Sequence, residues 1–477
     1  MEKQCFITVR DEVFCYVTGL QPSDNEMLWK EFGIFVDGHF WMPAFKMGRW
    51  DGRVRFFEKT GKTYLRLLDR ILPYLDKWGY DIVLKDERNV MPPPEKRLYQ
   101  DWFADKGATF KGNPIQIRPY QIEAVNSAID WGDGFIIAGT GAGKSLMCAG
   151  LCDVYGDMGY KTITVVPSSD LVTQTAEWYD LCKMDVGVYS GSEKDIYHQH
   201  VVATWQSLQN NPHVMHDFHT FIWDEAHGCK ASVAQEIVNK HGKHIPFRFG
   251  CTGTFPKPEA DQMSLYASIG GKRAEIPARW LMDNGYLAKV DIEPVEINET
   301  YIDEEFPDYA SERAFITKSP TRMDFIADLI ISKSLEFGNT LVLVSNIKFG
   351  EELQKLIKDS VFLYGGTEKD ERREHYDEYD KQDGLIKIAT FGIASTGISI
   401  DRVFCLILID AGKSYVKAIQ SIGRGTRLAA DKSYVHVVDV YSSLKWSKKH
   451  FKERAKWFKE AEYPCAAAKK VKLKKQK

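Results

Sequence analysis

The chain has 477 residues, of which 44% are apolar and 27% are charged. At roughly 100–200 residues per domain, this length predicts two to four globular domains. No run of about 18 apolar residues occurs and the first residues are not apolar, so neither a membrane span nor a secretory signal peptide is expected. The nine cysteines are scattered without a Cys-x-x-Cys pair, and a reduced, cytoplasmic protein without structural zinc is expected.

The net charge of −3 is unevenly distributed along the chain. Residues 445–477 hold 13 Lys and Arg against 3 Asp and Glu, a local charge of +10 that leaves −13 for all other residues. A basic end on an acidic body indicates a polyanionic partner such as nucleic acid. A solvated tail without a partner is the alternative.

Residues 1–92 predict a small α+β domain. A capping-box pattern at residues 23–26 predicts a helix that ends near residue 32, and a second helix is expected at 68–78. Turn signals at Asp51-Gly52 and Thr60-Gly61 separate β-rich runs at 40–50, 53–58 and 63–67, which predict a three-stranded meander. Three prolines at 92–94 then predict a linker.

From about residue 115, apolar β-rich runs alternate with helical segments, and the pattern restarts after about residue 290. Continuous apolar strands between helices indicate parallel sheets with helices on both faces. The sequence therefore predicts an α/β protein with two tandem domains at 93–285 and 286–462, the second ending in a helix at 443–462, and a disordered basic tail at 463–477. The predicted strands lie at 135–137, 162–166, 220–223, 248–251, 340–344, 361–364, 386–389, 403–409 and 434–440.

The stretch AGTGAGKS at residues 138–145 follows a predicted strand and precedes a helix. In such a loop, glycines let backbone N–H groups surround a phosphate, and the helix N-terminus adds positive partial charge. Lys144 then reaches the β- and γ-phosphates and Ser145 ligates Mg²⁺. The loop predicts ATP and Mg²⁺ as cofactors, bound by Thr140, Gly141, Ala142, Gly143, Lys144 and Ser145.

The stretch DEAH at residues 224–227 follows the strand predicted at 220–223. An acidic pair at the carboxyl end of a buried strand lies where open α/β sheets bind ligands. Asp224 can hold Mg²⁺ and Glu225 can polarise the attacking water. A helix cap is the alternative for Asp224 alone, but the preceding phosphate loop favours nucleotide hydrolysis.

Gln420, Arg424 and Arg427 lie at offsets of 0, 4 and 7 residues, on one face of a helix. Two guanidinium groups on that face can reach a γ-phosphate as arginine fingers, which raise rates by about 10³–10⁵ in other NTPases. A basic helix on the surface is the alternative.

Taken in chain order, these motifs resemble those of superfamily 2 helicases, which have two RecA-like domains. RPYQ at 118–121 looks like the motif that recognises adenine through its glutamine, and TGT at 252–254 resembles motif III, which couples hydrolysis to domain motion. VVPSSDL at 165–171 resembles motif Ia, TGIS at 396–399 motif V, and QSIGRGTR at 420–427 motif VI. Beyond the residues above, the resemblance implies nucleotide contacts by Arg118, Tyr120, Gln121 and Gly397, coupling by His227, Thr252 and Thr254, and DNA backbone contacts by Pro167, Ser168, Thr204 and Thr396.

The whole chain, including its N-terminal domain, most resembles the phage UvsW helicases, and more distantly XPB-like and RecG-like enzymes. The resemblance implies an ATP-dependent helicase of recombination, repair or replication restart. Such an enzyme acts on forks, D-loops and four-way junctions through sequence-independent backbone contacts, with other replication or recombination proteins as further partners. It implies a bacterial or phage-infected host cytoplasm, with the nucleus less favoured. A duplex translocase that does not separate strands and an RNA-remodelling helicase are the alternatives.

The stretch KMGRWDGRVRFF at residues 46–57 is the most specific point of that resemblance. Alternation after the Asp-Gly turn predicts a strand with Val54 and Phe56 in the core and two arginines in solvent. Trp50 either anchors the turn or stacks on a base pair, and an ordinary hairpin with a polar face is the alternative for the whole stretch. The candidate DNA contacts of this stretch are Arg49, Trp50, Arg53 and Arg55.

Overall fold

The computed structural model describes residues 3–225, 233, 235–253, 255–299, 305–394, 402–412, 433–460 and 462–473. The chain divides into two compact units, one of residues 1–138 and 143–276 and the other of residues 139–142 and 277–477. No helix among the described residues combines the length and apolar character needed to cross a membrane.

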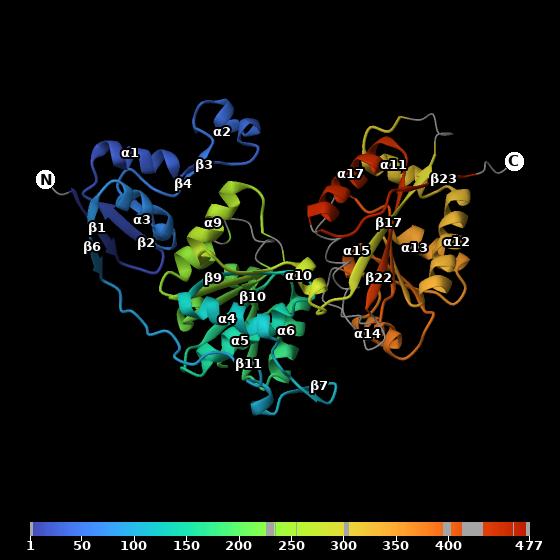
Figure 1. Cartoon of the computed structure of the whole chain (residues 1–477), viewed down its shortest axis with the longest axis horizontal. Coiled ribbons are helices and arrows are strands. Elements are labelled where there is room, and N and C mark those ends of the chain that lie inside the picture. Colours follow the sequence, from blue (N-terminus) through green and yellow to red (C-terminus); the bar gives the residue numbers. More distant parts are fainter. Residues whose placement is uncertain are drawn as a thin grey trace. The chain divides into compact units, whose positions relative to one another are not determined.

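The first elements of unit 1 form a mixed four-stranded sheet, which with its helices we call the N-terminal domain (Figure 1). Strand β1 pairs antiparallel with β2 and parallel with β6, in the order β5-β2-β1-β6. Helices α1 and α3 confirm the two predicted helices. The elements are β1 (Lys3–Val9), β2 (Phe14–Thr18), α1 (Pro22–Glu31), β3 (Gly33–Phe35), η1 (His39–Trp41), α2 (Pro43–Lys46), β4 (Arg53–Arg55), β5 (Lys62–Tyr64), η2 (Leu65–Leu67), α3 (Leu68–Lys77) and β6 (Tyr80–Asp86).

The predicted meander is wrong. Strand β4 pairs antiparallel with β3, and the residues between them carry the short helices η1 and α2 instead of a strand at 40–50. Pro43 opens α2, a position where its missing N–H is tolerated, and Gly38 and Gly48 adopt left-handed φ angles that end regular structure on either side. The predicted capping box is also absent, since Gln21 is the N-cap of α1 and makes no side-chain cap bond.

The rest of unit 1 is the first α/β domain, built on an eight-stranded sheet. Its strand order is β12-β11-β13-β10-β14-β15-β9-β16, and every pairing except β11 with β12 is parallel. The elements are η3 (Ala104–Lys106), β7 (Thr109–Phe110), β8 (Asn113–Pro114), α4 (Pro119–Trp131), β9 (Asp133–Ala138), α5 (Lys144–Gly156), β10 (Thr162–Val166), α6 (Ser169–Leu181), β11 (Val186–Ser190), β12 (Glu193–Lys194), β13 (His200–Thr204), α7 (Trp205–Asn210), η4 (Pro212–Asp217), β14 (Thr220–Asp224), η6 (Gln235–His241), β15 (Phe247–Thr252), α9 (Glu259–Ile269) and β16 (Lys272–Ile276).

Unit 2 contains the second α/β domain, whose seven strands pair in parallel in the order β19-β20-β18-β21-β22-β17-β23. All nine strands predicted for the two α/β domains are confirmed within two residues at each end. The elements are α10 (Ala278–Asp283), β17 (Lys289–Asn298), α11 (Tyr309–Ile316), α12 (Pro320–Phe337), β18 (Thr340–Val344), α13 (Ile347–Leu356), β19 (Val361–Leu363), α14 (Lys369–Asp377), η7 (Glu378–Asp380), β20 (Ile386–Thr390), α15 (Phe391–Ala394), β21 (Cys405–Ile409), β22 (Tyr434–Ser442), α17 (Lys445–Glu460) and β23 (Lys469–Lys472).

The prediction that the whole basic tail is disordered is wrong, because β23 adds a strand to the edge of this sheet. It pairs in parallel with the second half of β17, and Val471 packs against the domain core. Helix α17 confirms the predicted C-terminal helix, and its Trp446 and Trp457 are half-buried. The face that α17 buries carries Ser447, His450, Arg454 and Phe458.

The N-terminal domain and the first α/β domain share one hydrophobic core through α9. Met263 and Tyr266 of α9 belong to the same buried cluster as Leu28 and Ile71 of the N-terminal helices. Phe255, which precedes α9, packs against both this cluster and the core of the first α/β domain. The prolines at 92–94 are therefore not the only connection between the two domains.

A buried arginine joins the same two domains. Arg66, in η2, has a side chain that is 4% exposed, and its Nε lies 3.2 Å from Oδ2 of Asp133 at the start of β9. Its Nη2 donates to the carbonyl of Pro246 at 2.7 Å, and its Nη1 donates to the carbonyl of Glu12. Arg273 of β16 contacts the other carboxylate oxygen of Asp133 at 2.6 Å. One carboxylate therefore bridges two guanidinium groups, one from each domain.

Replacing Arg66 with alanine is expected to destabilise unit 1 strongly. Removing one member of a buried ion pair typically costs about 3–5 kcal/mol, because the remaining charge and the bonded carbonyls lose their partner. Urea unfolding of Arg66→Ala, followed by circular dichroism, measures the loss.

Arg70→Ala is the matched control. Arg70 is exposed and lies over the ring of Tyr266 at 4.3 Å, a cation–π contact worth about 0.5–1 kcal/mol at the surface. Equal losses of unfolding free energy in the two variants would contradict the assignment of Arg66 as the residue that joins the two domains.

Candidate nucleotide and DNA sites

The phosphate loop connects β9 to α5, as the sequence predicts. Gly143 is the N-cap of α5 and has a φ of +81°, which a side chain would strain. A Cβ at this position would lie 2.2 Å from Nε2 of Gln121. Gln121 itself is buried, and its Oε1 accepts a hydrogen bond from the backbone N–H of Arg118 at 3.0 Å. The structure thus brings the predicted adenine motif directly against the loop.

Lys144 and the acidic pair meet at the end of this loop. Nζ of Lys144 lies 3.6 Å from Oε1 of Glu225 and donates to the carbonyl of Ala138 at 3.4 Å. The backbone N–H of Glu225 donates to Oδ1 of Asp224 at 3.0 Å and to the carbonyl of Cys251 at 2.8 Å. These two bonds hold Glu225 at a φ of +54°. Such strained backbone costs about 1–3 kcal/mol and concentrates at functional sites.

The residues fit a magnesium nucleotide. The loop offers a glycine turn that a Cβ would fill, an ammonium group on Lys144 and a hydroxyl on Ser145. Asp224, at the end of β14, is buried and supplies a hard oxygen ligand of the kind Mg²⁺ prefers. Thr140, Gly141 and Ser145 are half-buried and Ala142 is fully buried.

The predicted DNA contacts of this domain follow the carboxyl ends of neighbouring strands, at the same end of the sheet as Asp224. Ser168 caps α6 after β10, and Thr204 caps α7 after β13. These two strands pair so that Val166 lies opposite Thr204, and Nε2 of Gln206 donates to the carbonyl of Pro167 at 3.5 Å. Because β10 is also the neighbour of β14, these residues lie beside the strand that ends at Asp224.

Thr252 is fully buried at the end of β15, opposite Ile137 of β9. It therefore lies between the strand of the acidic pair and the strand of the phosphate loop.

Several predicted site residues lie outside the described residues, and their roles stay predictions: His227, Thr254, Thr396, Gly397, Gln420, Arg424 and Arg427.

The exposure of side chains on β4, which carries Arg53 and Arg55, differs from the prediction. Arg53 and Arg55 are half-buried and Val54 is 38% exposed, while Phe56 is buried as expected. Arg53 donates to the carbonyl of Gly33 at 2.6 Å, and its guanidinium stacks on Phe35 at 3.9 Å. The strand belongs to a two-stranded ribbon, so its outer face is not packed on a core, and the guanidinium groups find partners within the ribbon.

The other three candidates of this stretch differ from one another in their contacts. Arg55 pairs with Asp51 and lies over Trp29 at 4.0 Å. Nε1 of Trp50 donates to the carbonyl of Arg53 at 2.8 Å, as the anchoring interpretation requires. Arg49 remains exposed.

Sequence reasoning missed two sets of residues. Arg66 and Asp133 were not singled out, because isolated charges far apart in the chain give no local signal. Phe40 and Trp41 were assigned to a strand although Pro43 follows closely, and that proline, which suits the first turn of a helix, was the available signal.

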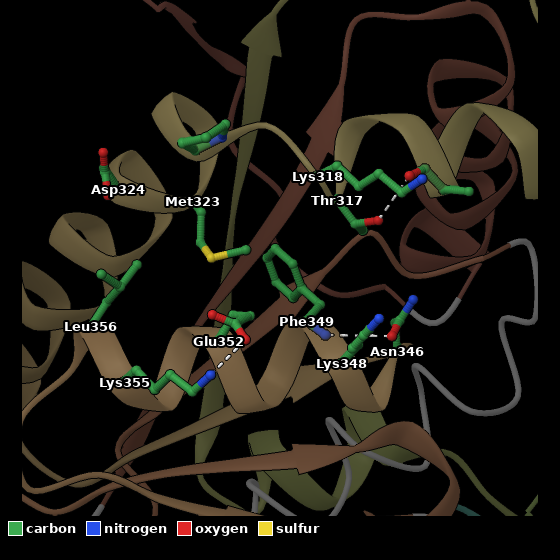
Figure 2. A pocket seen from close by; sticks show the side chains of 12 residues that line it. Thr317, Lys318, Met323, Asp324, Asn346, Lys348, Phe349, Glu352, Lys355 and Leu356 are labelled. Atoms are coloured by element: carbon green, nitrogen blue, oxygen red, sulfur yellow. Dashed lines mark hydrogen bonds and ion pairs between the residues drawn. The ribbon is translucent and has the colours of Figure 1, made fainter.

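A cavity of about 500 Å³ lies in unit 2, between the end of α11 and helices α12 and α13 (Figure 2). Met323, Phe349 and Leu356 supply apolar side chains, and Lys318, Lys348 and Glu352 supply charged ones. None of the predicted site residues that the structure describes lines it.

Three family models match the chain: "DNA helicase UvsW, N-terminal" at residues 13–85, "Type III restriction enzyme, res subunit" at 114–257 and "Helicase conserved C-terminal domain" at 321–429. The chain is 26% identical over 437 residues to "ATP-dependent DNA helicase uvsW" of Enterobacteria phage T4, with 86% of each chain covered. It is 24% identical over 338 residues to "DNA 3'-5' helicase XPB" of Mycobacterium tuberculosis, covering 66% of this chain and 59% of that relative.

Among solved structures, "ATP-dependent Type ISP restriction-modification enzyme LlaBIII bound to DNA" superimposes with a TM-score of 0.58 at 13% identity, over 86% of this chain and 34% of that one. This likeness concerns the fold.

Two largely parallel sheets, a phosphate loop and an acidic pair beside it define an ATPase of the helicase class, with two RecA-like domains. With these matches, the chain is a DNA helicase and DNA-dependent ATPase that resembles the phage UvsW helicases.

Gly143→Ala is expected to weaken nucleotide binding about fivefold to 150-fold. The new Cβ collides with Gln121 while the backbone is strained, and a combined cost of about 1–3 kcal/mol corresponds to that loss. Equilibrium binding of a fluorescent ATP analogue measures it.

Gly159→Ala is the control variant, because it strains the backbone as Gly143→Ala does but creates no collision with a side chain. Gly159 has a φ of +78°, and no atom lies within 4 Å of its added Cβ. This variant should lose about 1–2 kcal/mol of stability and keep its nucleotide affinity. Equal loss of affinity in both variants would show that the contact with Gln121 is irrelevant.

Proposed function

We propose that this helicase uses ATP and Mg²⁺ to remodel branched DNA, namely forks, D-loops and four-way junctions, in recombination, repair or replication restart. One observation carries the proposal: the domain that matches the UvsW N-terminal model shares a buried core with the first α/β domain. A second DNA-contacting module held rigidly against a motor can engage a duplex arm while the motor tracks along one strand. The T4 relative supports a phage-infected host cytoplasm as the place of action.

In the proposed reaction, Lys144 contacts the β- and γ-phosphates, and Ser145 and Asp224 hold the metal. Bound Mg²⁺ neutralises charge on the phosphates. Glu225 orients the attacking water and accepts its proton. Because the ammonium of Lys144 already lies against Glu225, this one charge can serve either the carboxylate or a phosphate. Gln121 recognises the base at the start of α4.

In the proposed reaction, the second α/β domain supplies further site residues, which lie outside the described residues. Gln420, Arg424 and Arg427 act on the γ-phosphate, and Gly397 contacts the nucleotide. Thr396 joins Pro167, Ser168 and Thr204 in backbone contacts, which are blind to base sequence. The domain limits at residues 92, 285 and 462 belong to the same proposal and accord with the ranges that the family models match.

Glu225→Gln is expected to bind ATP at least as tightly as the parent and to hydrolyse it about 10²–10⁴ times more slowly, because a general base is lost while Lys144 is released to the phosphates. Lys144→Ala should lose ATP binding. Single-turnover hydrolysis and nucleotide binding measure the two effects.

Glu259→Gln, an exposed carboxylate in the first turn of α9, should change neither quantity. Hydrolysis by Glu225→Gln at the parental rate would refute its role as the base.

The substrate class is tested with a panel of labelled fork, four-way junction, D-loop, blunt duplex and single strand, in matched DNA and RNA versions. The proposal predicts strand release or branch migration on branched DNA. ATP hydrolysis on duplex DNA without strand release would identify a translocase, and activity confined to RNA would overturn the proposal.

A further inference from the structure

The residues between β3 and β4, 36–52, form a projection that we call the tip (Figure 1). It exposes four large apolar side chains to solvent: Phe40 is 51% exposed, Trp41 71%, Met42 39% and Met47 61%. The stem that carries it adds Phe35 and Val54. The rings of Phe40 and Trp41 lie with their centroids 5.3 Å apart. A group of exposed large apolar side chains of this kind marks an interaction site.

The tip is held in place by its own bonds. The backbone N–H of Val36 donates to the carbonyl of Gly52 at 2.9 Å, and that of Arg49 donates to Ala44 at 2.9 Å. His39 stacks on Phe35 with ring centroids 4.6 Å apart, and a Cβ on Gly52 would lie 2.6 Å from its ring. The exposed rings are therefore presented by an ordered scaffold.

The charges beside these rings favour a nucleic acid over an apolar protein partner. Residues 36–55 carry four basic and two acidic side chains, a net charge of +2 in a chain that is negative overall. Nζ of Lys46 lies 5.3 Å from the ring centroid of Trp41, and Arg49 is exposed nearby in sequence. Of the two acids, Asp51 is already paired with Arg55. Exposed aromatic rings flanked by cations are how proteins bind bases and phosphates together.

We propose that the tip stacks on the last base pair at a DNA branch point, with Trp41 and Phe40 covering the base pair and Lys46 and Arg49 contacting the adjoining phosphates. This inference rests on the proposed function and gives the branch-recognition site its residues. It assigns Trp41 the stacking role, because Nε1 of Trp50 is used inside the stem and Trp41 is the more exposed ring.

The test is a DNA fork that carries 2-aminopurine either at the branch or ten base pairs inside one arm, titrated with the full chain without nucleotide. The parent should change the fluorescence of the branch probe and leave the internal probe unchanged. Trp41→Ala should abolish this signal and weaken fork binding roughly fivefold to a hundredfold, the range for losing one stacked base. Trp41→Phe should restore most of both. Changing Lys46 and Arg49 to alanine should lower the salt slope of fork binding by about 0.9 for each phosphate that the protein no longer neutralises.

Two variants serve as controls. Tyr197 is 87% exposed and precedes the start of β13, at the sheet edge opposite the phosphate loop, so Tyr197→Ala should leave both signals unchanged. Trp50→Ala should lower the melting temperature because its bond to Arg53 is removed, whereas Trp41→Ala should not.

Unchanged branch fluorescence and fork affinity in Trp41→Ala would overturn the inference. So would a parent that self-associates through the tip, with Trp41→Ala becoming monomeric while its fork binding is unchanged. If the parent prefers forks no more than duplex, the proposed function fails instead. In that case 2-aminopurine at a blunt duplex end still tests whether the tip stacks on a terminal base pair. An unchanged fluorescence of this probe would overturn the inference as well.

Discussion

The contact between Arg66 and Asp133 fixes the relation between the N-terminal domain and the first α/β domain. Burial lowers the pKa of Arg66 below its ordinary value, while the carboxylates of Asp133 and Glu12 oppose that change. The guanidinium nevertheless stays charged at neutral pH, as arginine does in proteins. A buried charge tolerates few geometries, because every donor needs an acceptor. The acceptors come from Glu12 of one domain and from Asp133 and Pro246 of the other, so the two domains can satisfy the arginine only in one mutual arrangement.

The aromatic contacts around Phe255 extend this arrangement toward the candidate nucleotide site. Phe255 packs edge-on against Phe135 of β9 at 5.2 Å and stacks on Tyr266 of α9 at 5.3 Å. Phe135 lies in the strand that leads into the phosphate loop, and Phe255 follows Thr252 by three residues. One ring therefore touches the strand of the nucleotide site and the helix that the N-terminal domain packs on. The tip is consequently attached to a body that is continuous with the ATPase, although the sequence places about ninety residues between them.

Local sequence patterns predicted most of the fold and the candidate nucleotide site, because each of these patterns depends only on neighbouring residues. The phosphate loop, the acidic pair and the apolar strands follow from short runs whose chemistry is self-contained. Strand β17 escaped detection because Asp291, Glu293 and Pro294 interrupt its apolar pattern. The exposure of Arg53 and Arg55 was misjudged because their partners lie on β3 and α1, a tertiary contact that alternation cannot foresee. The arginine fingers lie outside the described residues, so they rest on helical spacing and on the resemblance to motif VI.

Strand β23 has a consequence for how the protein behaves at high concentration. It is the last strand of the seven-stranded sheet, and three of its four residues are exposed lysines. The outer edge of such a sheet is a template onto which a strand of another molecule can add. Lysines along that edge repel a second copy and keep water around the unpaired backbone groups. The basic end of the chain thus protects the second α/β domain against edge-to-edge aggregation, and neutralising these lysines would favour fibrous assembly even where every catalytic residue is intact.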